Sequence, residues 1–503
     1  MNLDPAACYR AVLARDPRYD GRFFTCVKTT RIFCRPICPA RPPKLQNCLF
    51  LPTAAAASEA GFRPCLRCRP ESSPALDAWR GTEATVSRAL RLIESGALDS
   101  SSISSLAHRL HIGQRQLRRL FRQHLGAAPV TVAQTRRLLL AKQLIHQTNL
   151  PMTHIALASG FRSIRRFNET FQRLYHRPPS DLRRTKAAPI PSPEISLLLP
   201  YRPPYDWHAL LNFFRARAIP GLEHITDSSY SRTIHLHKTT GSFTVSHAPD
   251  HNALRAVVRF PRLCDLSLII ARIRRMFDLA ADPIAINAVL SADPLLAPLI
   301  AARPGLRVPG GWDPFEVAVR AILGQQVSVK AATTLASRLV AALGPRIPAT
   351  PAFPTLTHAF PQPEHFTPAA LAPLPITRPR AAALANLAAT AAADPHLFDP
   401  HPDLDQTVEH LCTLPGIGNW TAHYIALRAL NEPDAFLAAD VGLQRAFPQP
   451  PASPRPSAPQ LLLHAHRWRP WRAYAALHLW TSESPTQSPT QLHTQEPPHA
   501  LTA

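Results

Sequence analysis

Acidic residues are scarce in this sequence. Its 503 residues include 33 Asp and Glu against 56 Lys and Arg, which gives a formal net charge of +23. A basic but inert surface is one interpretation, although the excess is large for it. The charge predicts a polyanionic partner, most simply nucleic acid.

Long apolar runs are also lacking. No stretch of about 18 apolar residues occurs, so we expect no membrane span. The first residues, MNLDPAACYRAVLARDPRYD, contain no basic segment followed by an apolar core, so we expect no secretion signal. The cysteines number nine, and this odd count favours a reducing cytoplasm over a disulfide framework.

Four of the nine cysteines stand in two tight pairs. Cys34 and Cys38 form a C-x3-C pair, Cys65 and Cys68 form a C-x2-C pair, and 26 residues separate the two pairs. Two short chelate loops of this kind bring four thiolates to one tetrahedral Zn²⁺. Buried free thiols or chance pairs are the alternatives. The spacing predicts one zinc site with these four ligands.

The sequence around the pairs carries a family resemblance. FFTCVKTTRIFCRPICPARPP and ASEAGFRPCLRCRP resemble the N-terminal zinc domain of the Ada-type methylphosphotriester DNA repair proteins, over residues 4–72. The resemblance implies that Cys34 is both ligand and nucleophile and takes a methyl group from a DNA phosphotriester. Losing one negative charge there would raise the affinity for DNA. Arg35 and Arg41 are candidate phosphate ligands. A purely structural zinc domain is the alternative.

Two segments farther along repeat a helix, a short turn and a basic helix. They are SISSLAHRLHIGQRQLRRLFRQHLG (102–126) and PMTHIALASGFRSIRRFNETFQRLYH (151–176). In a helix-turn-helix unit the second helix enters the major groove of DNA. Residues 84–185 strongly resemble the AraC-type DNA-binding domain, in which a long helix, here about 129–148, joins two such units.

The second helix of each unit carries side chains suited to base edges. Arg suits guanine, and Gln or Asn suits adenine. Some of these side chains could instead face phosphates and specify nothing. The candidate DNA-binding residues are Gln114, Arg115 and Arg118 in the first unit and Arg165, Arg166 and Asn168 in the second.

A glycine turn marks the C-terminal half. LPGIGNWTAHYIALRAL (414–430) places Gly416 and Gly418 directly before a helix. Such a turn exposes backbone N–H groups that can hold a DNA phosphate. The stretch, together with WDPFEVAVRAILGQQVSVKAATTLASRLV and RWRPWRAYAALHLW, resembles the helix-hairpin-helix base-excision glycosylases. Within them it is most similar to 3-methyladenine DNA glycosylase II, over about residues 194–485.

This second resemblance implies roles for individual residues. Asp440 matches the catalytic aspartate, and Trp420, Tyr424 and Trp480 match aromatic residues that line the base pocket. Gln326 stands at the DNA wedge, where the close relative has an apolar residue, so it departs from the pattern. The alternatives are core packing for Trp420 and Trp480 and a helix N-cap for Asp440, which could also do both.

The implied chemistry gives these residue types a reason. Alkylation at N3 or N7 makes a purine cationic and weakens its bond to the sugar. An aromatic pocket favours the flipped cationic base, and a carboxylate stabilises the oxocarbenium-like sugar. Asn419 and Thr421 flank Trp420 where bifunctional relatives carry a lysine, so we predict a monofunctional glycosylase. The resemblance also implies a monovalent cation at the hairpin, near Cys412, Leu414 and Ile417.

The predicted fold class is multidomain, mainly α with α+β. It comprises a small zinc domain, two helix-turn-helix units, an α+β subdomain and an all-α helix-hairpin-helix glycosylase domain. The predicted boundaries are, in that order, 1–75, 82–185, 194–308 and 309–485, with a Pro-rich linker at 186–204 and a disordered tail at 486–503.

The combined prediction is DNA alkylation repair coupled to transcriptional regulation. The expected partners are alkylated double-stranded DNA, promoter DNA and RNA polymerase, and the expected state is a monomer in the bacterial cytoplasm, associated with the nucleoid. The alternative is a transcriptional regulator whose glycosylase half is catalytically weak or inactive. The O6-alkylguanine transferase signature PCHR does not occur, so that activity is not predicted.

Overall fold

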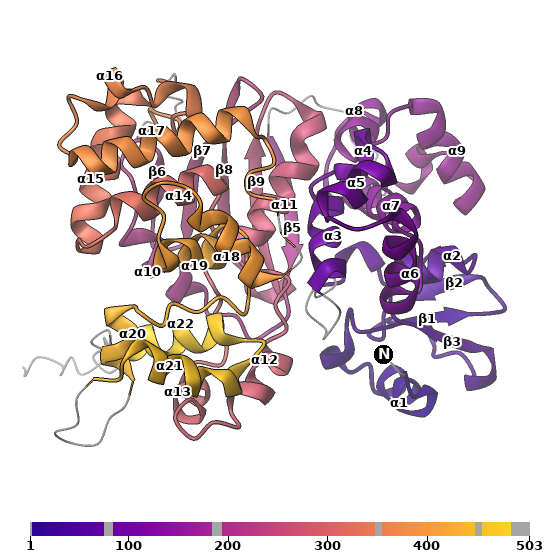
Figure 1. Cartoon of the computed structure of the whole chain (residues 1–503). Coiled ribbons are helices and arrows are strands. Elements are labelled where there is room, and N and C mark those ends of the chain that lie inside the picture. Colours follow the sequence, from indigo (N-terminus) through magenta and orange to yellow (C-terminus); the bar gives the residue numbers. More distant parts are fainter. Residues whose placement is uncertain are drawn as a thin grey trace, which may run out of the picture.

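A computed structural model of the chain describes residues 3–74, 84–183, 194–347, 355–399, 401, 403–447 and 455–483. The predicted tail at 486–503 and residues 186–193 of the predicted linker lie outside these ranges. Figure 1 shows the indigo and purple N-terminal part beside the magenta-to-yellow C-terminal part. In the described ranges, no helix has both the length and the apolar character needed to cross a membrane.

The N-terminal domain is built on a four-stranded sheet with the order β3-β1-β2-β4. Strand β1 pairs antiparallel with β2 and β3, and β2 pairs parallel with β4 through Phe33 and Pro64. That register places the two cysteine pairs at one end of the sheet. The elements are α1 (Pro5–Ala14), β1 (Phe24–Val27), β2 (Ile32–Cys34), β3 (Cys48–Leu51), α2 (Ala54–Glu59) and β4 (Arg63–Pro64).

The next domain is entirely helical. Ser102 and Ser163 cap the helices that begin after them, and Pro129 occupies the first turn of the long helix α7, where its missing N–H costs nothing. The helix predicted to join the two units is therefore present. The helices are α3 (Ala84–Glu94), α4 (Ala97–Ser100), α5 (Ile103–Arg109), α6 (Gln114–Leu125), α7 (Pro129–Gln147), α8 (Met152–Ala158) and α9 (Ile164–Tyr175).

An antiparallel sheet with the order β5-β9-β8-β7-β6 opens the C-terminal part. The stretches SFTV and ALRAVVRF, rich in β-branched and aromatic residues, lie largely in β8 and β9. The strands are β5 (Glu194–Pro200), β6 (Glu223–Ile225), β7 (Ser229–Leu236), β8 (Thr239–Ala248) and β9 (Ala253–Arg259). The helices are α10 (Trp207–Arg215), α11 (Leu266–Met276), α12 (Pro283–Leu290) and α13 (Ala297–Ala302).

The remaining helices form an all-α domain around one apolar core, which includes Leu339, Leu384 and Ile425. Its helices are α14 (Pro314–Leu323), α15 (Val329–Leu343), α16 (Pro368–Leu371), α17 (Arg378–Ala393), α18 (Leu404–Cys412), α19 (Asn419–Arg428), α20 (Val441–Ala446), α21 (Ala458–Ala465) and α22 (Arg472–Glu483).

The helical DNA-binding domain and the C-terminal part share a core. Phe167 of α9 belongs to the same buried apolar cluster as Leu197 of β5. Polar contacts add to this interface: the Arg109 guanidinium donates two hydrogen bonds to Asp399, at 2.6 and 2.7 Å, and Arg91 Nη1 donates to the Leu430 carbonyl at 2.6 Å. The modules are therefore packed against each other and not only linked through residues 184–193.

Candidate functional site

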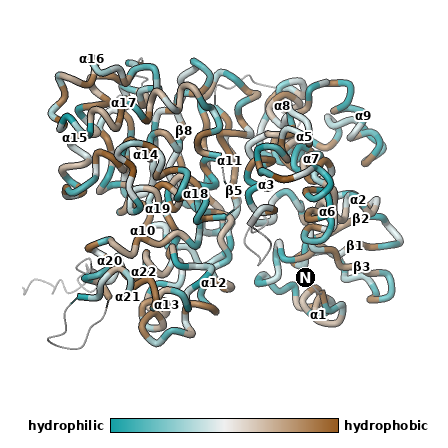
Figure 2. Tube along the Cα trace, in the orientation of Figure 1, coloured by the Kyte–Doolittle hydropathy of each residue, from teal (hydrophilic) through white to brown (hydrophobic). Residues whose placement is uncertain are grey.

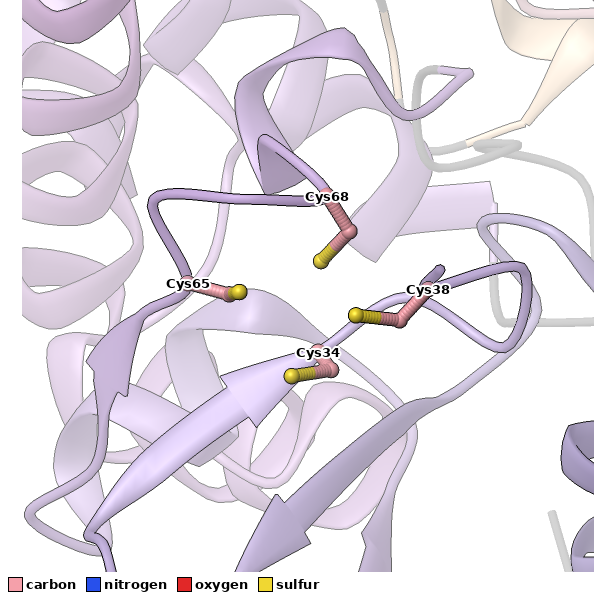
Figure 3. A group of neighbouring side chains, drawn as sticks. All are labelled: Cys34, Cys38, Cys65 and Cys68. Atoms are coloured by element: carbon pink, nitrogen blue, oxygen red, sulfur yellow. The ribbon is translucent and has the colours of Figure 1, made fainter. Parts of the chain in front are cut away.

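The four paired cysteines converge on one point. Figure 3 shows Cys34 at the end of β2, Cys38 in the loop after it, and Cys65 and Cys68 in one loop after β4, with the four sulfur atoms around a common centre. All four sulfurs lie within 4.8 Å of one another. Zn–S bonds of about 2.3 Å in a tetrahedron require sulfurs roughly 3.8 Å apart, so a small closure of the site accommodates the ion. The donor set and the spread of the sulfurs fit Zn²⁺.

Backbone N–H groups distinguish the four sulfurs. Arg35 N donates to Cys68 Sγ at 3.4 Å, and Arg67 N donates to Cys65 Sγ at 3.3 Å. Within the described residues, no backbone N–H donates to the Cys34 sulfur. Because a donated N–H withdraws charge from a thiolate, Cys34 keeps a more electron-rich sulfur than Cys65 and Cys68.

The two arginines predicted to hold phosphates near this site differ in their surroundings. Arg35 faces inward: its Nε donates to Asp20 Oδ1 at 2.8 Å, its Nη2 contacts Oδ2, and its Nη1 donates to the Cys68 carbonyl at 3.2 Å. Arg41 is exposed. The Arg35 guanidinium is thus occupied by the protein and shapes the cysteine loop, whereas Arg41 is open to a ligand.

The predicted DNA-reading residues lie on the outer faces of α6 and α9. Both helices run mostly teal in Figure 2, the colour of hydrophilic residues, and most of their apolar side chains, among them Leu117 and Phe167, are buried. The outward side chains form a basic and amide-rich surface on each helix. Those that are exposed are Gln114, Arg115, Arg118, Arg165, Arg166 and Asn168.

The glycine turn lies between α18 and α19, and a side chain from a distant segment binds it. Gly416 has φ +84°, which favours glycine, and Gly418 is the N-cap of α19. Gln325 Nε2 donates to the Gly416 carbonyl at 2.8 Å and to Thr421 Oγ1 at 3.0 Å. Nothing in the local sequence distinguishes Gln325 from the adjacent Gln326, so this role of Gln325 could not be predicted from the sequence.

Gln326 itself stands at the exposed turn between α14 and α15. Its φ is +54°, an unusual value for a residue other than glycine. The neighbouring Gln325 is anchored on both sides, since the Arg380 guanidinium contacts its carbonyl oxygen while its own amide binds the glycine turn. The side chain of Gln326 is therefore presented to solvent by a fixed backbone.

The Asp440 carboxylate accepts hydrogen bonds from both tryptophans that are predicted to line the base pocket. Trp420 Nε1 donates to Asp440 Oδ2 at 3.0 Å, and Trp480 Nε1 donates to Oδ1 at 3.0 Å. Asp440 is also the N-cap of α20 and accepts from Leu443 N at 3.0 Å. The carboxylate thus combines a helix cap with contacts to two indoles from helices α19 and α22. The two tryptophans are half-buried and do not belong simply to the apolar core.

Tyr424 extends this aromatic surface. Its ring stacks on that of Trp420 with centroids 5.3 Å apart and planes at 14°. Arg428 Nη1 donates to the Tyr424 hydroxyl at 3.0 Å. Burial raises the pKa of Tyr424, but the positive charges of Arg428, Arg217 and Arg320 outweigh it, so the net pKa is lowered.

Three domain families match separate parts of the chain. Residues 7–71 match the metal binding domain of Ada, residues 106–185 a helix-turn-helix domain, and residues 196–313 the AlkA N-terminal domain. With the sites described above, they define a multidomain DNA-binding protein that carries a metal-binding domain of the Ada type.

Known proteins are similar to the whole chain or to a part of it. The "Probable bifunctional transcriptional activator/DNA repair enzyme AlkA" of Mycobacterium tuberculosis is 42% identical over 489 residues, 96% of this chain and 97% of that protein. The DNA-3-methyladenine glycosylase 2 of Escherichia coli is 37% identical over 293 residues, 57% of this chain and 96% of that protein. The bifunctional transcriptional activator/DNA repair enzyme AdaA of Bacillus subtilis is 30% identical over 176 residues, 35% and 81%.

The match to the mycobacterial protein spans nearly both full lengths. This chain belongs to the family of bifunctional transcriptional activator/DNA repair enzymes to which that protein belongs. The predicted family resemblances and the predicted fold class are confirmed. The predicted metal character of the four-cysteine site is supported by both its geometry and its domain family.

Proposed function

We propose that this chain excises N-alkylated purines of the 3-methyladenine type from double-stranded DNA by hydrolysis, takes up methyl groups from DNA phosphotriesters at Cys34, and regulates transcription. The observation that supports the glycosylase activity best is the Asp440 carboxylate, held by Trp420 and Trp480 in the same domain as the glycine turn. The similarity to the E. coli glycosylase, over 293 residues and 96% of that protein, supports the same activity.

The excision step follows from the charge of the substrate. In an alkylated purine the C1′–N bond breaks, its electron pair goes to the cationic base, and the sugar becomes oxocarbenium-like. The Asp440 carboxylate stabilises that charge and orients a water molecule, whose oxygen bonds to C1′ as one of its protons passes to the carboxylate. The products are the free base and an abasic site. Backbone N–H groups at Gly418 hold a nearby phosphate.

No lysine stands beside Trp420 to form a Schiff base with the abasic sugar, because its neighbours are Asn419 and Thr421. The activity is therefore monofunctional, without strand cleavage. Borohydride treatment during turnover tests this point. A covalent protein–DNA adduct that depends on an internal lysine would contradict it.

The methyl-transfer step uses Cys34. Bound Zn²⁺ would keep all four thiols deprotonated at neutral pH. The Cys34 sulfur attacks the methyl carbon of a phosphotriester, a C–S bond forms, and the C–O bond breaks with its electron pair on the phosphate oxygen. The products are a thioether and an ordinary phosphodiester, so each chain reacts once. Cys34 is favoured over Cys65 and Cys68 because the sulfurs of those two residues accept backbone N–H groups.

Transcriptional regulation follows from charge and from the two helix-turn-helix units. Methylation removes one negative charge from the cysteine site, which strengthens binding to promoter DNA through α6 and α9. We include RNA polymerase as a partner, a monomeric state and a monovalent cation at the glycine turn in this proposal.

The decisive experiment compares base release by the wild type and Asp440→Asn. Duplex DNA containing 3-methyladenine is incubated with each protein, and the free base is measured. We expect release by the wild type and a rate about 100-fold or more lower for the variant. If neither protein releases base above background, the glycosylase activity is refuted and the chain is a regulator with an inactive glycosylase half.

Methyl uptake is tested separately. The full chain is incubated with DNA that carries labelled methylphosphotriesters, and label on the protein is counted. Cys34→Ala should take up none, while Cys264→Ala, an exposed cysteine far from the other four in sequence, should behave as the wild type. Uptake that persists in Cys34→Ala would place the acceptor elsewhere.

A further inference from the structure

The two tryptophans beside Asp440 use their N–H groups, not only their ring faces. Each indole N–H is 3.0 Å from a different carboxylate oxygen. The three residues belong to different elements: Trp420 is on α19, Trp480 is on α22, and Asp440 is the N-cap of α20. Stacking against a base requires an aromatic ring, but these contacts require an indole nitrogen.

The hydrogen bonds leave the two carboxylate oxygens unequal. Each oxygen of an ionised carboxylate accepts about two hydrogen bonds. Oδ1 accepts from Trp480 Nε1 and from Leu443 N, so its capacity is filled. Oδ2 accepts from Trp420 Nε1, which is its one donor among the described residues. Oδ2 therefore retains a lone pair for a water molecule or for the positive charge at C1′.

Neighbouring residues hold this arrangement in place. The Trp420 ring is fixed by its stack on Tyr424, at 14° between planes. Gly442 lets Trp480 approach the carboxylate, because a Cβ at residue 442 would lie 3.0 Å from Asp440 Oδ1 and 3.4 Å from Trp480 Cδ1. Even an alanine at this position would crowd the contact between the indole and Oδ1.

We propose that Trp420 and Trp480 are positioning residues that, through their N–H groups, hold the Asp440 carboxylate with Oδ2 toward the reacting sugar. This inference rests on the proposed glycosylase activity. It assigns the catalytic contact to one oxygen and gives the tryptophans a role that phenylalanine cannot fulfil. Charge-assisted hydrogen bonds of this kind are about twice as strong as neutral ones, so their loss should be measurable.

The test uses Trp420→Phe and Trp480→Phe, which keep an aromatic ring and remove the N–H. Trp207→Phe is the matched control, because Trp207 lies in the α+β subdomain and its indole N–H has no partner among the described residues. Single-turnover release of 3-methyladenine is measured for each. We expect a loss of roughly 10- to 100-fold for the first two variants and a change within about 3-fold for the control.

A second readout separates positioning from a merely structural role. Binding is measured to duplexes that carry a cationic pyrrolidine or a neutral tetrahydrofuran in place of the target nucleotide. Loss of a well-placed carboxylate should weaken pyrrolidine binding about 10-fold or more and leave tetrahydrofuran binding within about 3-fold. Equal weakening on both duplexes, or wild-type rates and binding in both variants, would overturn the inference.

Gly442→Ala provides an independent variant if a tryptophan substitution unfolds the protein. It displaces Trp480 from Oδ1 while every indole stays present, and we expect the same selective loss of pyrrolidine binding. Asp440→Asn serves as the reference. If that variant releases base at the wild-type rate, the proposed function fails together with this inference. If it is inactive while the other three variants match the wild type, the inference alone fails.

Discussion

Lys142 and Glu71 form a salt bridge that is closed to solvent. The Lys142 Nζ lies 2.7 Å from Glu71 Oε2, and the two side chains are 0% and 2% exposed. The same Nζ donates to the Cys65 carbonyl at 3.3 Å. Lys142 belongs to α7, the helix that joins the two helix-turn-helix units, so this pair fastens the cysteine loop to the DNA-binding domain.

Breaking this pair should destabilise the N-terminal half strongly. Lys142→Met leaves the Glu71 carboxylate buried without its charge partner, and such a loss costs about 3–5 kcal/mol. Thermal unfolding in the presence of zinc is the measurement. The double variant Lys142→Met/Glu71→Gln should recover part of the loss.

An exposed pair serves as the control. Disrupting the pair of Arg165 and Glu169 with Arg165→Gln should cost at most about 0.5 kcal/mol of stability. A similar loss of stability in Lys142→Met and Arg165→Gln would contradict the buried state of the Lys142–Glu71 pair.

Zinc binding should require all four paired cysteines. Cys38→Ser should lower the bound zinc well below one ion per chain, because a three-thiolate site binds the ion less tightly. Zinc content by elemental analysis is the measurement, and Cys412→Ser, which alters an exposed cysteine outside the site, is the control. Removing zinc with a chelator should unfold the N-terminal domain while the helices α14 to α22 stay folded. The circular dichroism of the protein should therefore keep the helical signal of α14 to α22. Full zinc in Cys38→Ser would rule out a four-cysteine site.

The two hairpin glycines should respond differently to alanine. At Gly416 the φ of +84° is unfavourable for alanine, and a Cβ would lie 2.4 Å from that of Ala383. We expect Gly416→Ala to cost about 2 kcal/mol or more in stability. At Gly418 a Cβ would meet nothing within 4 Å, so Gly418→Ala should change stability by less than about 1 kcal/mol.

The proposed phosphate contact at Gly418 can be tested by DNA binding. If the N–H groups at Gly418 approach a phosphate, Gly418→Ala should weaken binding to duplex DNA although its stability is preserved. Chemical denaturation and binding measurements on both variants check the pair of expectations. Equal stability of the two variants would contradict the observed turn geometry.

Acid should destabilise the glycosylase domain through His478. This histidine of α22 is 3% exposed, and burial lowers its pKa to about 4. The unfolded chain takes up a proton near pH 6.5 and the folded chain does not, so stability is present above pH 6.5 and is lost as the pH falls toward 4, by about 1.4 kcal/mol per pH unit.

His478→Gln should flatten that dependence. Urea unfolding of the variant and the wild type at pH 7 and pH 5 measures it. The matched control is His251→Gln, which replaces an exposed histidine and should keep the wild-type slope. An unchanged slope in His478→Gln would mean that another group causes the acid sensitivity.

Local patterns allowed much of the fold to be predicted. The apolar residues Val86, Leu90, Leu106 and Leu117 recur at helical spacing along the sequence, and all of them are buried. The second helix of each unit lies within the predicted unit, and the long joining helix lies close to its predicted range. These features depend on contacts within one or two helical turns, so the order of residues is sufficient to reveal them.

Contacts between distant segments were not predictable in the same way. Arg35 looked like a free phosphate ligand, but Asp20 lies close enough in the fold to bind it. Gln325 looked no different from Gln326, yet its amide binds the glycine turn, 91 residues away. Lys142 and Glu71, 71 residues apart, meet only because α7 packs against the cysteine loop.

The sequence by itself determined the four-cysteine set, the paired helix-turn-helix units and the glycine turn, because each depends on the spacing of residues along a short segment. Only the tertiary structure decided which cysteine sulfurs accept a backbone N–H and which oxygen of Asp440 stays open. The indole donors are 20 and 40 residues from Asp440, and three helices must pack together before their N–H groups can reach one carboxylate.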